Sequence, residues 1–219
     1  MSGHFLDTTA WERHALFRFF LSYEVPTFNL CADVDVTETV EYCRSEGHSF
    51  SMVCWYFCQL AVNSLEPFRY RLRGDQVWVW DRIRVSTTIL NPDETFRFCH
   101  FPYAEHFPEF VAGAKAAISA QPTDVMDDRP DDDGVIHGST VPWLRFTSVS
   151  HARRTVRGDS IPKIVLGRYG ATSNRLTMPV SVEAHHALMD GIVAARFYKH
   201  LESYFTNVTT KIPPDVVLI

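Results

Sequence analysis

The segment from residue 50 to residue 65, FSMVCWYFCQLAVNSL, is apolar on nearly every side of a helix. A helix without a polar face is typical of the interior of a protein core, so the other elements have to surround it. The chain has 219 residues, enough to bury one such core without splitting into several domains. We expect a single domain over residues 1–219, in which residues 206–219 are a C-terminal extension.

Two of the five cysteines, Cys54 and Cys58, lie one helical turn apart in this segment. That spacing could suit a metal site, but the neighbours Trp55, Phe57 and Leu60 favour buried thiols, because free cysteine behaves as a small hydrophobic residue. The odd number of cysteines and the lack of a CxxC pair argue against disulfides and for a reducing compartment. The histidines also lack established zinc-ligand spacing, so no metal is expected.

Composition excludes two further classes of function. The formal net charge is −5, which gives no basic surface for nucleic acid. The longest apolar runs are shorter than the roughly 20 residues of a membrane span, and the N-terminus MSGHFLDTTAWERH has no apolar signal region. We therefore expect a soluble, cytoplasmic protein with no nucleic-acid partner and no membrane partner.

Four further helices are predicted from apolar spacing and from end signals. Thr9 is a plausible cap for the first, and Gly47 ends the second with the residue type that tolerates positive φ. Pro213 and Pro214 cannot continue a helix, so a tail follows the last one. The predicted ranges are residues 9–22, 37–46, 107–120 and 190–205.

Strand-like runs fill much of the remaining chain. The region 69–101 is interrupted at Gly74-Asp75 and at Asn91-Pro92, two turn-forming dipeptides that indicate hairpins. The acidic stretch DVMDDRPDDDG is interpreted as a solvated loop. The other strand-like runs are residues 27–36, 138–150, 161–170 and 175–186. This order predicts an α+β fold, with a large mixed, mainly antiparallel sheet and helices on one side.

The last strand-like run enters the final helix through HHALMDG, residues 185–191. Successive side chains of a strand point to opposite faces, so only one of His185 and His186 can face a given cleft. Histidine suits proton removal near neutral pH, because its ordinary pKa is about 6.5. A catalytic base and a hydrogen-bonded histidine at a strand end both fit this pattern.

The segment PVSVEAHHALMDGIVAARFYKHLESY, with Trp-Glu-Arg at residues 11–13, resembles the chloramphenicol acetyltransferase family. WERHALFRFF, DETFRFCHFPY, GSTVPW and PKIVLGRY extend the resemblance over nearly the whole chain. HHxxxDG also occurs in dihydrolipoamide acyltransferase cores and peptide-synthetase condensation domains, but the length and the W-x-R motif favour the first family. The resemblance implies that family's sandwich fold, acetyl-CoA as co-substrate with no permanently bound cofactor, a small hydroxyl acceptor such as chloramphenicol, and a homotrimer with sites between subunits.

The resemblance also implies roles for individual residues. His186 is the general base whose activated hydroxyl attacks the thioester directly, without an acyl-enzyme, and Ser139 supplies a hydrogen bond to the oxyanion. Asp190 pairs with Arg13 and supports the site structurally. Considered alone, Ser139 could equally be a turn residue and Arg13 a solvated helix residue.

Coenzyme contacts are implied in the same way. Trp143 and Tyr169 match family positions that line the coenzyme channel, and Arg168 is a candidate partner for a phosphate, since guanidinium groups pair well with phosphate oxygens. As aromatic residues, Trp143 and Tyr169 also fit a role in the core.

The acceptor pocket departs from the family pattern. Phe20 replaces a tyrosine, Val165 a threonine and Phe98 a small residue, while His151 and Arg153 replace apolar side chains. Such a pocket favours a more polar or anionic acceptor, although a one-residue shift in register would turn these side chains outward. The residues assigned to the pocket by resemblance are Phe19, Phe20, Phe28, Phe96, Phe98, Val149, His151, Arg153 and Val165.

Three hypotheses follow for the function. The first is chloramphenicol O-acetylation of the antibiotic-resistance type. The second is an acyltransferase that uses the same residues on a different, more polar alcohol or amine. The third is a catalytically idle homologue that binds CoA.

Overall fold

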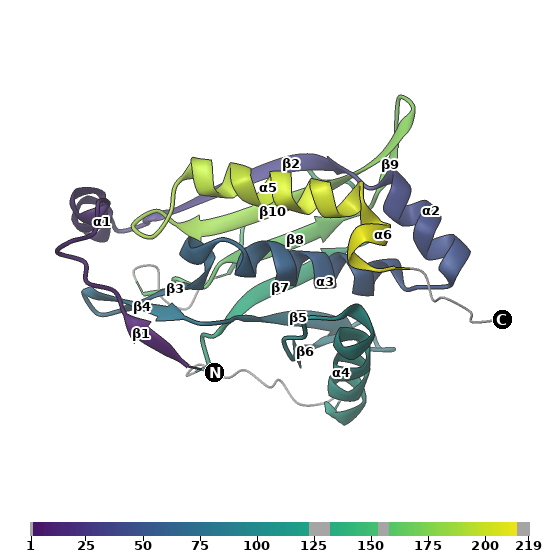
Figure 1. Ribbon diagram of the computed structural model, residues 1–219, viewed down its shortest axis with the longest axis horizontal. Helices are drawn as coiled ribbons and strands as arrows, with labels where there is room; N and C mark the ends of the chain where they lie inside the picture. Colours follow the sequence, from purple (N-terminus) through teal and green to yellow (C-terminus); the bar gives the residue numbers. More distant parts are fainter. Residues whose placement is uncertain (1, 123–131, 153–157, 214–219) are drawn as a thin grey trace.

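The computed structural model describes residues 2–122, 132–152 and 158–213, and within them a seven-stranded mixed sheet forms the centre of the molecule (Figure 1). Six strands run in the order β2-β10-β8-β7-β5-β6, and the short β9 pairs with β10. β7 is parallel to β5 and β8, and the other neighbours are antiparallel. The predicted α+β class is therefore confirmed. The strands are β2 Thr27–Asp35, β5 Arg84–Leu90, β6 Phe96–Phe101, β7 Val135–Val141, β8 Lys163–Gly167, β9 Gly170–Thr172 and β10 Arg175–His185.

A smaller antiparallel sheet has the order β1-β4-β3, with β1 Gly3–Phe5, β3 Tyr70–Arg73 and β4 Gln76–Trp80. Arg71 links it to the large sheet, since its guanidinium donates to the carbonyl of Asp133 at 2.6 Å and to that of Val135 in β7. Burial lowers the pKa of Arg71 to about 10, and the negative charge of Asp133 opposes this shift. The surrounding carbonyl oxygens let a charged group stay buried at the junction of the two sheets.

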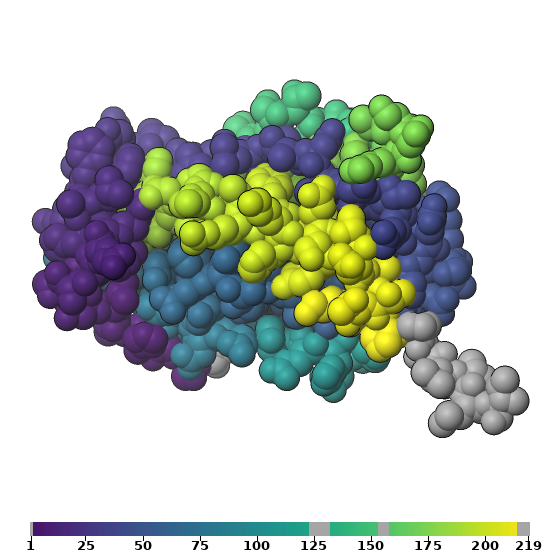
Figure 2. All heavy atoms as spheres, turned by 45° about the horizontal axis from the view of Figure 1, so that its top comes forward, coloured from purple at the N-terminus to yellow at the C-terminus, as the bar shows by residue number. Residues whose placement is uncertain are grey.

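Helices cover one face of the large sheet, where α3 (Phe50–Asn63) and α5 (Gly191–Phe205) lie side by side (Figure 1). In Figure 2, α5 and the short α6 form the yellow surface beside the purple N-terminal residues. None of the described helices is long and apolar enough to cross a membrane. The remaining helices are α1 His14–Leu21, α2 Thr37–Glu46, α4 Phe107–Ala120, α6 Val208–Lys211 and the 3-10 helix η1 Glu66–Arg69.

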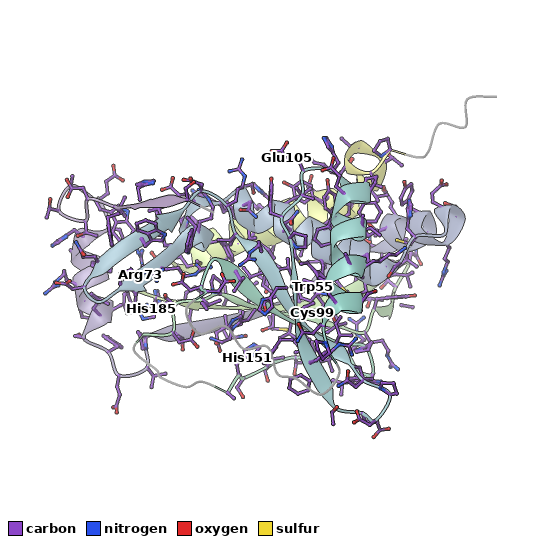
Figure 3. All side chains as sticks on the ribbon, turned by 90° about the horizontal axis from the view of Figure 1, so that it is seen from below. Trp55, Arg73, Cys99, Glu105, His151 and His185 are labelled. Atoms are coloured by element: carbon purple, nitrogen blue, oxygen red, sulfur yellow. The ribbon has the colours of Figure 1, made fainter. Side chains whose placement is uncertain are left out.

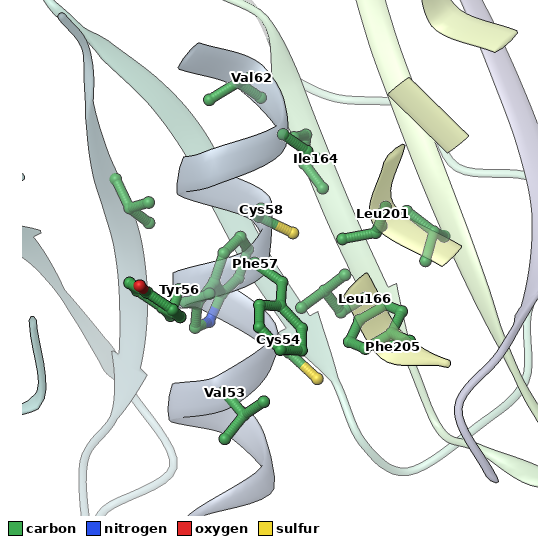
Figure 4. Close-up of a cluster of buried hydrophobic side chains, with 14 of the residues drawn as sticks. Val53, Cys54, Tyr56, Phe57, Cys58, Val62, Ile164, Leu166, Leu201 and Phe205 are labelled. Carbon is green, nitrogen blue, oxygen red and sulfur yellow. The ribbon is translucent and has the colours of Figure 1, made fainter. Parts of the chain in front are cut away.

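α3 is the buried helix that the sequence predicts. Cys54 and Cys58 lie in the core that α3 forms with Leu166 of β8 and with Leu201 and Phe205 of α5 (Figure 4). Burial raises the pKa of both thiols, so both stay neutral at physiological pH. These two cysteines are therefore core residues.

The two faces of the sheet differ in character because side chains alternate along each strand. Ile164 and Leu166 belong to the core under the helices, so Lys163 and Val165 point to the opposite face. Gly138 of β7 also faces α3, since a Cβ there would lie 2.5 Å from the ring of Trp55. Its neighbour Ser139 therefore projects from the face that the helices do not cover.

Several predicted boundaries are confirmed. α2 and α4 have the predicted ranges, and Gly47 after α2 adopts a left-handed conformation with φ 71°. Gly74 has φ 64° in the β3–β4 hairpin, and Asn91-Pro92 lies in the turn between β5 and β6. Local turn chemistry determined these positions.

Two predicted boundaries are wrong. The first helix begins at His14, with Arg13 as its N-cap, because Thr9 hydrogen-bonds to the carboxylate of Asp7 in a separate turn. The strand predicted for residues 138–150 ends at Val141, and Pro142, which has no backbone N–H, follows it. The segment after Pro142 therefore approaches the sheet as irregular chain.

The described part of the C-terminal extension packs against the domain. Val208 and Ile212 belong to the hydrophobic core, and the hydroxyl of Tyr42 donates to the carbonyl of Ile212 at 2.9 Å. These contacts hold α6 close to α2.

Candidate active site

Arg13 fixes the loop that carries the HHxxxDG motif. Its guanidinium forms a two-pronged ion pair with Asp190, in which Nη2 donates to Oδ1 at 2.7 Å. It also donates to the carbonyls of His186 and Ala187, the latter from Nε at 3.2 Å. The Arg13 side chain is only 14% exposed, so the alternative of a solvated helix residue is wrong.

His186 lies on this loop between two phenylalanines. Its ring stacks on that of Phe20, with ring centroids 3.9 Å apart and planes inclined by 5°. The ring of Phe28 lies on it as well, with a centroid distance of 4.8 Å. Nδ1 lies 2.9 Å from Oδ1 of Asp190, and a third of the side chain is exposed. The imidazole is therefore held in one orientation and remains accessible.

Asp190 contacts both a cation and the imidazole. Burial favours its neutral form, but the hydrogen bonds and charge of Arg13, followed by His186, outweigh burial and lower the pKa of Asp190. The sequence predicted the pair with Arg13 and missed the approach of Asp190 to His186. The i,i+4 spacing of these two residues was the available signal.

His185 takes the opposite direction, as strand alternation requires. Its side chain is buried, and its Nδ1 accepts a hydrogen bond from the backbone N–H of Ala187 at 3.2 Å. His186 is therefore the histidine of this pair that is open to a substrate.

Ser139 lies far from His186 within the same chain. Ser139 of β7 is in register with Val165 of the neighbouring strand β8. Val165 is in turn in register with Ser181 of β10, the next strand. His186 lies five residues beyond Ser181, which places it roughly 16 Å along the strand and roughly 10 Å across the sheet from Ser139. One chain therefore does not bring the two predicted catalytic residues together.

Ser139 opens into a cavity of about 310 Å³ on the face of the sheet without helices. Phe96 and Phe98 of β6 line it, as does His151. Figure 3 labels His151 and also His185, the buried neighbour of His186. Further polar lining comes from Ser86, Thr88, His100 and His137, which the sequence analysis did not select.

Six of the nine predicted acceptor-pocket residues lie at one or the other of these two places. Phe20 and Phe28 contact His186, and Phe19, 54% exposed, packs on Phe20. Phe96, Phe98 and His151 belong to the cavity. Val165 is buried and in register with Ser139, but it does not line the cavity. Val149 is half-buried and also outside the lining, and Arg153 lies outside the described residues.

The three predicted coenzyme residues lie on adjoining segments. Trp143 is 60% exposed, and the backbone N–H of Arg168 donates to the carbonyl of Leu144 at 3.0 Å. Arg168 is exposed, while Tyr169 packs edge-on against Phe50 at the start of α3. Trp143 and Arg168 are therefore open to a ligand, and Tyr169 is partly a core residue.

Within residues 2–122, 132–152 and 158–213, no three histidine, cysteine or acidic side chains are grouped so that they could hold a metal ion. Among the described residues, the imidazole of His186 can take up or release a proton, the hydroxyl of Ser139 can donate a hydrogen bond, and the indole of Trp143 is open to solvent.

Comparisons with known proteins identify the family. The sequence model of the family "Chloramphenicol acetyltransferase" matches residues 1–202. A chloramphenicol acetyltransferase of Clostridium perfringens is 26% identical, over 96% of this chain and 98% of that protein. One from Streptomyces acrimycini is 30% identical, over 92% and 94%.

Solved structures agree with this result. A chloramphenicol acetyltransferase structure superposes with a TM-score of 0.88 at 28% identity, covering 93% of this chain and all of that one. The cubic core of the pyruvate dehydrogenase complex has a TM-score of 0.64 at 16% identity, covering 89% and 86%, which shows a shared fold only. The chain belongs to the chloramphenicol acetyltransferase family and is an acyltransferase.

Proposed function

We propose that the protein is an acetyl-CoA-dependent O-acetyltransferase of the chloramphenicol type, with its active sites between the subunits of a homotrimer. In each site His186 of one subunit faces Ser139 and the cavity of the next. The observation that carries this proposal is a partly exposed imidazole with fixed orientation, stacked on Phe20 and held by Asp190, which Arg13 binds in turn, in a chain of this family.

The separation of Ser139 from His186 supports a site shared by two subunits. Apolar side chains near His186 are also unusually exposed, among them Phe19 at 54% and Val25 at 61%. Ile192, at the start of α5, is 62% exposed. Larger exposed apolar patches are typical of protein–protein interfaces, so these side chains are candidates for the contact between subunits.

The chemistry begins with proton removal. Because Nδ1 of His186 is turned towards Asp190, Nε2 is the nitrogen left to take the proton of the acceptor hydroxyl. The oxygen attacks the thioester carbonyl, and the tetrahedral oxyanion accepts a hydrogen bond from Ser139. When this intermediate collapses, the C–S bond breaks, and the CoA thiolate recovers the proton from His186. The acetyl group passes directly to the acceptor, without an acyl-enzyme.

Coenzyme binding is assigned to the surface around Trp143. The exposed indole offers a face for the adenine or pantetheine portion, and Arg168 is placed to pair with a phosphate. Tyr169 supports this surface from the core side through its contact with Phe50.

The test is thiol release from acetyl-CoA with chloramphenicol as acceptor. We expect turnover in the wild type, a loss of at least about 10²-fold in His186→Ala, and a loss of about 10²–10³-fold in Ser139→Ala. His200→Ala is the matched control, because His200 hydrogen-bonds to Ser64 on the surface, away from the proposed site. Turnover retained in His186→Ala would exclude this mechanism.

A different acceptor is the second candidate, and the position of His151 in the cavity favours it. Thiol release with another alcohol or amine, and none with chloramphenicol, would support this candidate. CoA binding without turnover on any acceptor would instead support a catalytically idle homologue.

A further inference from the structure

One row of polar side chains crosses the large sheet at a single level. His100 of β6 is in register with Ser86 of β5, and Ser86 with His137 of β7. The row continues from His137 to Lys163 of β8 and on to Glu183 of β10. Residues in register on adjacent strands point to the same face, so all five project from the face opposite α3 and α5.

Four of these five side chains line the cavity that contains Ser139: His100, Ser86, His137 and Lys163. Thr88 lies two positions from Ser86 on the same strand and adds a second hydroxyl. Phe96 and Phe98, with ring centroids 5.8 Å apart, supply the aromatic part of the lining. The cavity thus combines a polar floor with aromatic walls.

The charges of this floor are paired. Lys163 is buried, with Nζ 2.6 Å from Asp159 and 3.5 Å from Glu183. The remaining carboxylate of the lining, Asp132, pairs with Arg84. Because each charge has a partner within the protein, the cavity does not require a charged ligand.

The hydroxyl groups are different. In the part of the chain that the structure describes, no hydrogen bond engages the hydroxyl of Ser86, Thr88 or Ser139. A hydroxyl can both donate and accept a hydrogen bond. A ligand that carries several hydroxyls can satisfy these three hydroxyls of the protein, whereas an apolar ring would bury them without partners, at a cost of roughly ten-fold in affinity for each.

We propose that the acceptor of this enzyme is a small polyhydroxylated molecule of the saccharide or polyol class. It binds on the polar floor, with its C–H faces against Phe96 and Phe98. The inference rests on the proposed function, because it names the substrate of that same site. The volume of about 310 Å³ lies at the lower end of the range for ligand pockets and suits one sugar-sized unit.

The test compares acceptors and variants in one thiol-release assay with acetyl-CoA. The acceptors are methyl glucoside, N-acetylglucosamine, inositol and chloramphenicol. Thr88→Val keeps the shape and removes one hydroxyl, and His137→Leu removes one imidazole. Thr209→Val, on the exposed side of α6, is the matched control.

We expect at least one of the three polyols to have a higher kcat/KM than chloramphenicol. Thr88→Val and His137→Leu should each lower that value about 3- to 10-fold and leave the value for chloramphenicol equal or higher. Thr209→Val should change neither. Turnover of chloramphenicol above every polyol, or polyol turnover that neither variant affects, overturns the inference and leaves the proposed function intact.

Absence of thiol release with all four acceptors would contradict the proposed function instead. Calorimetry with the CoA-loaded protein then decides the inference separately. Polyol binding that weakens in Thr88→Val supports the assigned cavity, and no polyol binding overturns it.

Discussion

The imidazole of His186 and the ring of Phe20 lie face to face, 3.9 Å apart and inclined by 5°. Phe20 belongs to α1 and His186 to the loop after β10, so this stack fixes the predicted base against a helix from the other end of the chain. Phe20 therefore orients the imidazole as well as filling space.

Replacement of Phe20 by leucine should lower kcat by about 10- to 100-fold, because a loosely oriented base spends less time in reactive geometry. KM for acetyl-CoA should stay unchanged, since the predicted coenzyme residues lie elsewhere. Steady-state kinetics on purified protein check this. The control is Phe5→Leu, which alters an exposed ring that packs edge to face against Trp78 of the small sheet. Equal loss in both variants would point to general destabilisation.

Arg13→Met should reduce both stability and activity. The change removes the ion pair with Asp190 and the hydrogen bonds to the carbonyls of His186 and Ala187. We expect a loss of about 1–3 kcal/mol in the free energy of unfolding, less than the roughly 3–5 kcal/mol for breaking a fully buried pair, because Asp190 is one-third exposed. Arg18→Met, at an exposed position of the same helix, is the matched control. Denaturant unfolding of both variants measures the difference.

The same pair predicts a dependence of stability on pH. The pKa of Asp190 is lower in the folded protein than the ordinary value of about 3.9. Its contribution to stability is therefore fully present above pH about 4 and is lost as the pH falls through the folded-state pKa. The difference in unfolding free energy between wild type and Asp190→Asn should be constant from pH 7 to pH 5 and shrink below pH 4. Asp75→Asn, in an exposed turn, should show no such convergence.

The thiols should differ in reactivity. Burial raises the pKa of Cys43 to about 11 and raises those of Cys54 and Cys58 as well, while Cys99 is buried in the same core. Cys31 is only partly buried, although burial and the charge of Asp33 raise its pKa too. A thiol-specific reagent should modify at most one cysteine in the native protein, and Cys31→Ser should abolish that reaction. Fast modification of two or more thiols would contradict the buried positions.

Sequence reasoning succeeded where the determining signal is local. Gly47 after α2 and the proline-initiated helix α4 were placed correctly, because caps and turn residues act within a few positions. The start of α1 was misplaced because Thr9 could cap a helix or bond to Asp7, and only the folded chain decides between them.

The polar row could not be predicted from the sequence. Ser86, His137 and Lys163 look unrelated in the chain, and only the pairing of β5, β7 and β8 brings them to one level. The approach of Asp190 to His186 likewise depends on the loop conformation that Arg13 imposes. The motif indicated which residues matter, and long-range contacts determined what they touch.

The separation of Ser139 and His186 has a genetic consequence in the proposed trimer. A chain that carries His186→Ala still has an intact cavity, and a chain that carries Ser139→Ala still has an intact base. The two variants can be denatured together and refolded as a mixture. An interface that joins the intact His186 of one chain to the intact Ser139 of the other should then regain activity that each variant alone has lost. Two defective copies of the gene in one cell should therefore complement each other.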